Sequence, residues 1–123
     1  MNTYKLGDME SRMAQLIWDN APLTSKQLVD LCSKHFEWKR TTTYTMLKRL
    51  CERGIFDLTD STVNVVITKE EYYASKGQQF IDESYEGSLP MFISRFTKSN
   101  GLTDKDIEEI QRIIDSYRES KDD

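Results

Sequence analysis

Three amphipathic segments joined by short links, followed by two β-rich runs, occupy the first 68 residues, and this order constrains the fold more than any other feature. The segments begin at Asp8, Thr24 and Thr41, and within each one apolar residues recur at intervals of three and four, as along one face of a helix. The runs 55–59 and 63–68 are rich in β-branched residues and flank "DST", which predicts a small hairpin. We therefore expect three helices followed by a two-stranded sheet.

Short signals mark the ends of these helices. Asp8 stands at the position of an N-cap, and Thr24 and Gln27 have the spacing of a capping box. Gly54 follows the third segment, where a glycine commonly ends a helix. Three helices and a hairpin in this order are typical of a winged helix-turn-helix, whose third helix lies in the major groove of DNA. We expect residues 1–70 to form this domain.

The rest of the chain, residues 71–123, predicts a helical region. Thr68 and Glu71 repeat the capping-box pattern before a long, weakly apolar helix. Ser88 then stands as the cap of a second helix, and Thr103 as the cap of a third. The predicted fold class is mainly α with a small β-hairpin: a winged helix-turn-helix N-terminal domain followed by a helical dimerisation region.

The last two helices carry apolar stripes that a small winged domain cannot cover alone. The stripes have helical spacing and consist of Leu89, Phe92, Ile93, Phe96, Ile107, Ile110, Ile113, Ile114 and Tyr117. Two copies of the chain would bury these stripes against each other, and their two-fold axis would match a palindromic DNA site. The alternative is that the two helices pack back on their own domain.

The segment "WKRTTTYTMLKRL" begins a helix with β-branched threonines, which are poor helix formers. On a helix, most of the threonines share an outward face with a tyrosine and several cations, while Leu47, Leu50 and Cys51 face inward. Hydroxyls, methyl groups and cations suit the groove and phosphates of DNA. The DNA-binding residues we predict are Lys39, Arg40, Thr41, Thr42, Tyr44, Thr45, Lys48 and Arg49. The alternative is that one threonine only caps the helix and the tyrosine only shields its side.

The charge of the chain is unevenly distributed. The whole chain carries −4, but residues 34–53 hold six cations against two carboxylates. A basic segment inside an acidic protein fits a nucleic-acid contact, and it also fits a solvated helix face. The hairpin carries Asp57 and Asp60 and no cation, a pattern that suits a winged-helix protein-interaction adaptor without direct DNA reading. Salt-dependent binding to duplex DNA separates the two functions.

The residues give little support to catalytic, metal-binding or membrane functions. The single histidine, His35, stands at a polar helix end, and no nucleophile–base pattern, glycine-rich phosphate loop or metal-ligand spacing is present. We expect no enzyme activity, no catalytic or metal-binding residue and no cofactor. Cys32 and Cys51 fall in apolar helical patterns, which favours buried free thiols. The sequence shows neither a membrane span nor a signal peptide, so we expect a cytoplasmic protein without direct membrane insertion.

Beyond these patterns, the chain resembles the penicillinase repressor family of winged-helix transcriptional regulators over nearly its full length. The resemblance rests on "MAQLIWDN", on "WKRTTTYTMLKRLCERG" and above all on "FIDESYEGSLPMFISRFTKSNGLTDKDIEEIQRII". It implies a bacterial transcriptional repressor that binds a palindromic operator in double-stranded DNA and forms a homodimer through its C-terminal helices.

The resemblance also implies a way of release from DNA. In the lactam-responsive members a membrane-bound sensor protease cuts the first helix of the dimerisation hairpin, at a place that corresponds here to Arg95 and Phe96. This chain departs from the family at Arg95, where familiar members have asparagine, and in its hairpin, where the family usually has cations. Its tail, "IIDSYRESKDD", has none of the cysteines that the copper-responsive branch uses.

Overall fold

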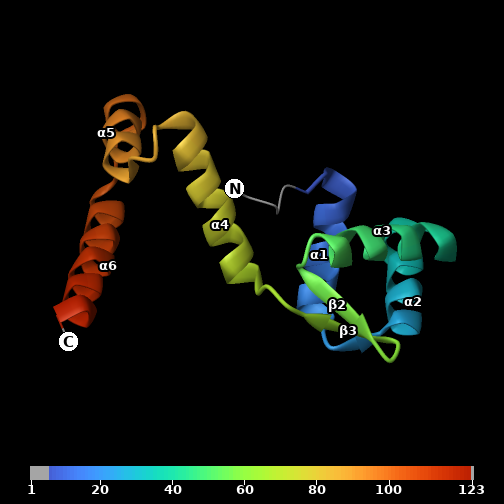
Figure 1. Ribbon diagram of the computed structural model, residues 1–123. Coiled ribbons are helices and arrows are strands. Elements are labelled where there is room, and N and C mark those ends of the chain that lie inside the picture. The colour runs from blue at the N-terminus through green and yellow to red at the C-terminus, as the bar shows by residue number, and fades with distance from the viewer. Residues whose placement is uncertain (1–5, 123) are drawn as a thin grey trace. The chain divides into compact units, whose positions relative to one another are not determined.

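The computed structural model describes residues 6–122 and divides the chain into two compact units, one ending at Phe80 and the next beginning at Ile81. Six helices and three strands follow one another in the described residues (Figure 1). Their bounds are α1 Asp8–Asn20, β1 Leu23–Thr24, α2 Ser25–Phe36, α3 Arg40–Glu52, β2 Phe56–Thr59, β3 Thr62–Val65, α4 Lys69–Ser84, α5 Leu89–Asn100 and α6 Asp104–Asp122. The prediction of a mainly α fold, with a winged helix followed by a helical region, is confirmed.

The core of the first unit lies where α1, α2 and α3 meet the sheet. Its buried members are Met13, Ala14, Ile17, Leu23, Leu28, Cys32, Met46, Leu47, Leu50, Ile55, Phe56, Val63 and Tyr72. At its edge the Trp18 ring centre lies 5.4 Å from that of Phe56, and the indole N–H donates to the Ile67 carbonyl at 3.0 Å. The Tyr72 ring centre, on α4, lies 5.3 Å from that of Trp18. The first unit therefore extends past the hairpin into α4.

The helix starts follow the sequence signals with one correction. Asp8 is the first residue of α1 rather than its N-cap, and Gly7 takes the cap position without a side-chain hydrogen bond. Asp8 therefore favours the helix through its charge near the positive end of the helix dipole. The capping box of α2 is confirmed, since Thr24 N–H donates to Gln27 Oε1 at 2.8 Å and Gln27 N–H donates to Thr24 Oγ1 at 3.0 Å. The capping box at the start of α4 is also present.

The sheet has the strand order β1–β3–β2, so a third, two-residue strand joins the expected hairpin. Leu23 pairs with Val63, and Thr24 pairs with Thr62, both in antiparallel register. Because β1 runs directly into α2, this pairing fixes the hairpin beside the N-terminus of α2. A two-residue strand leaves no periodic pattern in a sequence, so β1 was not predicted.

The hairpin, which we call the wing, is shorter than the sequence suggests. Its turn consists of Asp60 and Ser61, both with positive φ, the conformation that tight two-residue hairpin turns require. After β3, the N–H groups of Val66 and Ile67 both donate to the Ile55 carbonyl and leave the strand ladder. The second strand therefore ends earlier than the expected run 63–68.

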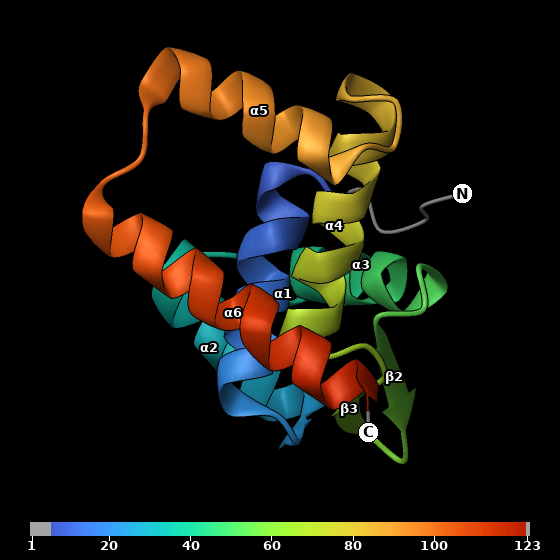
Figure 2. The ribbon, with the colours of Figure 1, turned by 90° about the vertical axis from the view of Figure 1, so that its left-hand side faces the viewer.

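In the second unit, α5 and α6 follow the predicted caps. Ser88 Oγ accepts the N–H of Met91 at 3.1 Å, and Thr103 Oγ1 accepts the N–H of Asp106 at 3.0 Å. The chain turns between the two helices at Gly101, whose φ is +70°. Figure 2 shows that α5 and α6 run in different directions from this turn. Among residues 6–122, no helix combines the length and the apolar character that a membrane span requires.

Candidate DNA interface

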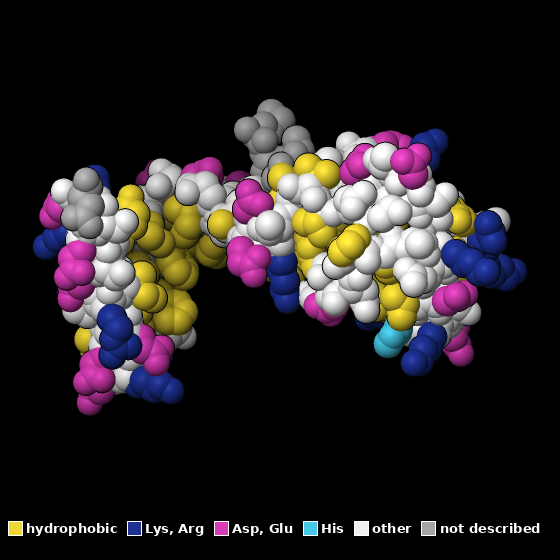
Figure 3. Space-filling view, turned by 90° about the horizontal axis from the view of Figure 1, so that it is seen from below, with side chains coloured by type: hydrophobic (Ala, Val, Ile, Leu, Met, Phe, Trp, Pro, Cys, Tyr) yellow, Lys and Arg dark blue, Asp and Glu magenta, His cyan; other side chains and the backbone are white. Residues whose placement is uncertain are grey.

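The outward side of α3 presents a continuous set of hydroxyls and cations. We call this surface the recognition face, and its exposed members are Lys39, Arg40, Thr41, Thr42, Thr45, Lys48 and Arg49. Lys39 occupies the N-cap position and Arg40 is the first helical residue. Figure 3 shows Lys and Arg side chains gathered at the end of the first unit where α3 begins. The structure thus brings the predicted DNA-binding residues together on one element, with Tyr44 as the one half-buried member.

Thr43 differs from the other threonines of α3 in its burial. Its side chain is fully buried, and its hydroxyl donates to the Lys39 carbonyl at 3.3 Å. Burial raises the pKa of the Cys32 thiol, and the neighbouring Thr43 side chain lowers it by less. Thr43 is therefore a residue of the interface between α2 and α3, consistent with its omission from the predicted DNA-binding set.

Thr45 offers its methyl group and an acceptor oxygen to solvent rather than a free hydroxyl proton. Its Oγ1 donates to the Thr41 carbonyl at 2.9 Å, one turn earlier in the same helix. Back-bonding of this kind occupies the hydroxyl proton. At an exposed position near a groove, the remaining methyl group suits contact with a thymine methyl.

Tyr44 lies differently from the exposed residues around it. It is half-buried, it packs against the core, and its hydroxyl donates to Ser25 Oγ at 3.3 Å. The guanidinium carbon of Arg40 lies 5.3 Å from the centre of the tyrosine ring, within the range of a cation–π contact. Tyr44 thus shields the side of α3 and also lies beside a cation of the recognition face. Its contact with DNA stays a prediction.

A shallow groove separates α3 from the first strand of the wing. Its volume is about 450 Å³, and the side chains that line it are Tyr44, Leu47, Lys48, Cys51, Asp57 and Leu58. Burial and the nearby Asp57 carboxylate both raise the pKa of the Cys51 thiol, burial more strongly. Both effects favour the neutral form of the Cys51 thiol. Both cysteines are free thiols, as expected, and Cys32 is fully buried. Cys51 is only half-buried, because it lines this groove.

Arg53, one of the cations of the basic segment, is engaged elsewhere. Its Nε lies 2.8 Å from Glu10 Oε2 on α1, and the Glu10 side chain is largely buried. The pair joins the end of α3 to α1. Arg53 is therefore a structural cation, and the recognition face depends on Lys39, Arg40, Lys48 and Arg49 for its charge.

Ser25 is the residue of this region that sequence reasoning missed. It begins α2, its N–H donates to the Ser61 carbonyl in the wing turn at 2.8 Å, and its hydroxyl accepts the hydrogen bond from Tyr44. The capping box at Thr24 predicted the start of α2 here, but nothing in the sequence pointed to the wing turn or to Tyr44 as partners. Over the described part of the chain, no group of three or more His, Cys, Asp or Glu side chains is arranged to hold a metal ion.

A three-helix unit with a wing and an exposed, cationic third helix defines the winged-helix class of DNA-binding proteins. Within that class, the family model described as penicillinase repressor matches residues 6–116, and the chain belongs to this family of transcriptional repressors, which are not enzymes. The chain is 23% identical to the penicillinase repressor of Bacillus licheniformis over 121 residues, with 95% of this chain and 94% of the relative covered. It is 20% identical to the methicillin resistance regulatory protein MecI of Staphylococcus epidermidis over 116 residues, with 91% and 94% covered.

Proposed function

We propose that this repressor reads DNA directly with α3 and acts as a homodimer on a palindromic operator. In this proposal residues 1–70 carry the DNA-binding function and residues 71–123 the dimerisation function, while the start of α4 with Tyr72 packs in the core of the first unit. The observation that carries it is the recognition face, a helix surface of hydroxyls and cations that faces solvent in a protein of a repressor family. The threonines lower the intrinsic helix propensity of α3, and exposure to water offers no compensating stability. A DNA groove, in contrast, offers a partner to each hydroxyl, methyl group and cation.

Within α3 the residues take different roles. Lys39, Lys48 and Arg49 contact phosphates and supply most of the non-specific affinity. Thr41, Thr42 and Thr45 lie between these cations, where hydroxyls and methyl groups reach base edges. The wing contributes little phosphate binding, because its exposed carboxylates, Asp57 and Asp60, are repelled by the DNA backbone.

Dimerisation is supported by the exposed apolar surface of the second unit. Among the described residues of α5 and α6 none is buried, although both helices have a strongly apolar side. Leu89 is 57% exposed, Ile113 67% and Tyr117 68%, and Ile93, Phe96, Ile107 and Ile114 are exposed as well. Figure 3 shows hydrophobic side chains gathered beside the charged side of α6. A second copy of the chain would remove this surface from water.

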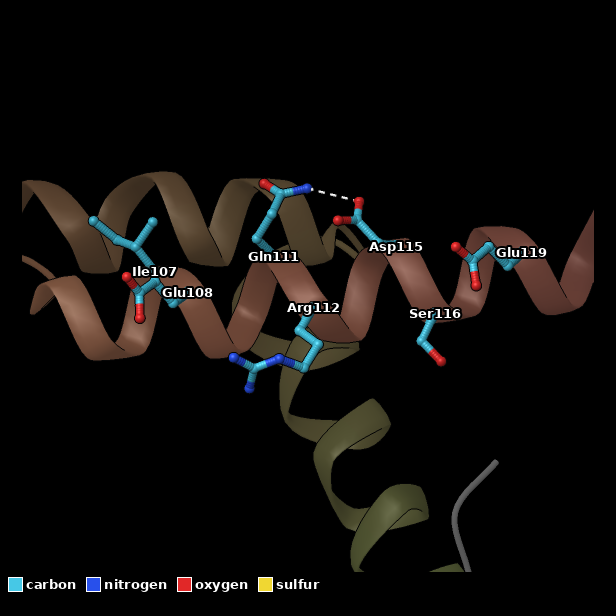
Figure 4. Close-up of a pocket in the computed structure, with 7 residues that line it drawn as sticks. All are labelled: Ile107, Glu108, Gln111, Arg112, Asp115, Ser116 and Glu119. Carbon is cyan, nitrogen blue, oxygen red and sulfur yellow. Dashed lines mark hydrogen bonds between the residues drawn. The ribbon is translucent and has the colours of Figure 1, made fainter.

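The charged side of α6 is distinct from this apolar stripe. An open groove of about 550 Å³ runs along it, and its lining residues all belong to α6: Ile107, Glu108, Gln111, Arg112, Asp115, Ser116 and Glu119 (Figure 4). Gln111 Nε2 donates to Asp115 Oδ1 at 2.9 Å across one helical turn. Ile107 lies at the border between this side and the apolar stripe, and the other lining residues are polar or charged. We therefore assign the polar side to solvent, and the stripe of Ile107, Ile110, Ile113, Ile114 and Tyr117 to the partner copy.

Release from DNA by proteolysis near Arg95–Phe96 is a further part of the proposal, with a membrane-bound sensor protease as the partner. Both residues are exposed on α5. The Phe96 ring centre lies 5.7 Å from that of Phe92, and the Arg95 guanidinium lies 5.8 Å from the centre of the Tyr85 ring. A cut at this bond divides α5 in the middle of the proposed dimer surface. Loss of the dimer removes the avidity of two linked half-sites, on the order of 10²–10⁴ in affinity.

Selection of bound sequences from a random duplex pool, followed by footprinting, tests the proposed function. The expected result is an inverted repeat whose half-sites are protected together, at a stoichiometry of two chains per site. Recovery of no preferred sequence, with weak binding that does not depend on salt, would favour the adaptor function instead. Intact full-length protein in cells after exposure to the true inducer would contradict the proteolytic step alone.

A further inference from the structure

Tyr44 lies where α3, the start of α2 and the wing turn meet. A residue that only reads DNA bases would not need these contacts. Its hydroxyl donates to Ser25 Oγ at the start of α2, and the Ser25 N–H in turn donates to the Ser61 carbonyl of the wing turn. The strand pairing of Thr24 with Thr62 holds the same two segments together. The start of α2, the wing turn and α3 therefore meet through Ser25 and Tyr44.

A cation lies over the ring of the same tyrosine. Arg40 is exposed, and its guanidinium lies over the Tyr44 ring, 5.3 Å from the ring centre. A planar guanidinium stacks on an aromatic ring and keeps its N–H donors at its edge, whereas a lysine ammonium cannot do both. The stacked Arg40 therefore offers its donors to an anion from a restricted set of conformations.

We propose that Tyr44 is a positioning residue that acts through Arg40, rather than a residue that reads bases itself. This inference rests on the proposed function and deepens it. The half-buried ring is fixed by the hydrogen bond to Ser25 and carries Arg40 over its face, so Arg40 rather than Tyr44 contacts a DNA phosphate. Because Tyr44 restricts the conformations of Arg40 before DNA binds, Arg40 loses less conformational entropy on contact. DNA affinity is therefore higher than with an unrestricted arginine.

A double-mutant cycle in DNA binding tests the inference. Arg40→Ala, Tyr44→Leu and the double variant are compared on the selected operator duplex. Loss of the stacked ring is expected to weaken binding by about fivefold per half-site, the scale of an exposed cation–π contact. In the Arg40→Ala background the same Tyr44→Leu change should cost less than twofold, since there is no arginine left to position. Equal costs in both backgrounds would overturn the inference and return Tyr44 to direct contact with DNA.

Two conservative variants give readouts that a merely structural role of Tyr44 would not change. Arg40→Lys keeps the charge but loses the planar stack, so affinity should fall while the slope of log K against log salt stays the same. Tyr44→Phe keeps the ring but loses the hydrogen bond to Ser25, so its loss should be smaller than that of Tyr44→Leu and should equal that of Ser25→Ala. Arg40→Lys binding as tightly as wild type would contradict the inference.

Lys76 supplies a matched control. Its ammonium lies about 6 Å from the ring centres of Tyr72 and Tyr73 on α4, so Lys76→Ala removes a cation that lies near two tyrosine rings, away from the recognition face. This variant should bind DNA as wild type does. If wild type itself shows no salt-dependent binding to duplex DNA, the proposed function has failed and the inference with it. If wild type binds and the cycle is additive, the inference alone has failed.

Discussion

Arg53 Nε donates to Glu10 Oε2 at 2.8 Å, and this ion pair connects the C-cap residue of α3 to the first turn of α1. Glu10 is 8% exposed, so its carboxylate depends on Arg53 for compensation in place of water. The pair divides the cations of the basic segment into two groups, one that holds α3 in the fold and one that faces solvent.

Glu10→Gln tests this division. The substitution keeps an acceptor oxygen for the Arg53 N–H but removes the charge of the pair. We expect a loss of about 1 kcal/mol in the free energy of unfolding, the difference between a hydrogen bond to a charged group and one to a neutral group. DNA affinity, measured well below the melting temperature, should equal that of wild type. Chemical denaturation and a binding titration on the same preparation provide both values, and a fall in affinity without a fall in stability would contradict the division.

Thr43 and Thr42, adjacent in α3, should respond oppositely to valine. Thr43→Val removes a buried hydroxyl that bonds to the Lys39 carbonyl, so it should lower stability by about 0.5–1.5 kcal/mol. Thr42 is exposed, so Thr42→Val should leave stability within about 0.5 kcal/mol but weaken operator binding. Thermal melts and operator titrations measure the two effects. A Thr42→Val variant that binds the operator like wild type would remove Thr42 from the proposed contact set.

The dimer is tested by a charge in its proposed surface. Ile114→Glu places a carboxylate in the apolar stripe of α6 and should give a monomer at micromolar concentration, because burying an unpaired charge is costly. Ser116→Glu, on the charged side of the same helix, is the matched control and should remain dimeric. Truncation before Ser88 should likewise leave a folded, monomeric N-terminal unit. Light scattering decides, and a wild-type monomer at the same concentration would contradict the proposal.

Stability should fall in alkaline solution because of the thiols. Burial raises the pKa of Cys32 and of Cys51, so the folded state holds these thiol protons more tightly than the unfolded state does. The contribution to stability is fully present below the ordinary thiol pKa of about 8.5 and is lost as pH rises through the higher folded-state pKa. Denaturation at a series of pH values measures it, and Cys51→Ala should reduce the loss. Asp57→Asn should speed alkylation of Cys51, since the nearby carboxylate raises its pKa.

Much of the fold could be predicted from local patterns. The apolar spacing of α1, α2 and α3, and the caps at Thr24, Thr68 and Ser88, depend on neighbours within a few residues, which a sequence shows directly. The outward position of Thr41 and Lys48 follows from helical periodicity alone.

The missed features all depend on partners far apart in the chain. Strand β1 exists only because Leu23 meets Val63, and the junction at Ser25 requires Ser61 and Tyr44 to arrive from separate elements. Nothing in the sequence distinguishes Arg53 from a surface cation, because its partner Glu10 lies 43 residues earlier in the chain. Such contacts are set by tertiary packing, which composition and periodicity do not encode.

The central claim is that the outward face of α3 contacts DNA, and a salt titration of duplex binding tests it most directly. Wild type is compared with Lys48→Ala/Arg49→Ala and with a charge-matched control, Arg12→Ala/Lys76→Ala, whose cations lie on α1 and α4. The recognition-face variant should bind specific and random duplexes more weakly, and the slope of log K against log salt should shrink by about two per monomer. The control should follow wild type. Identical titrations for the recognition-face variant and wild type would contradict the claim and favour an adaptor that does not read DNA with this helix.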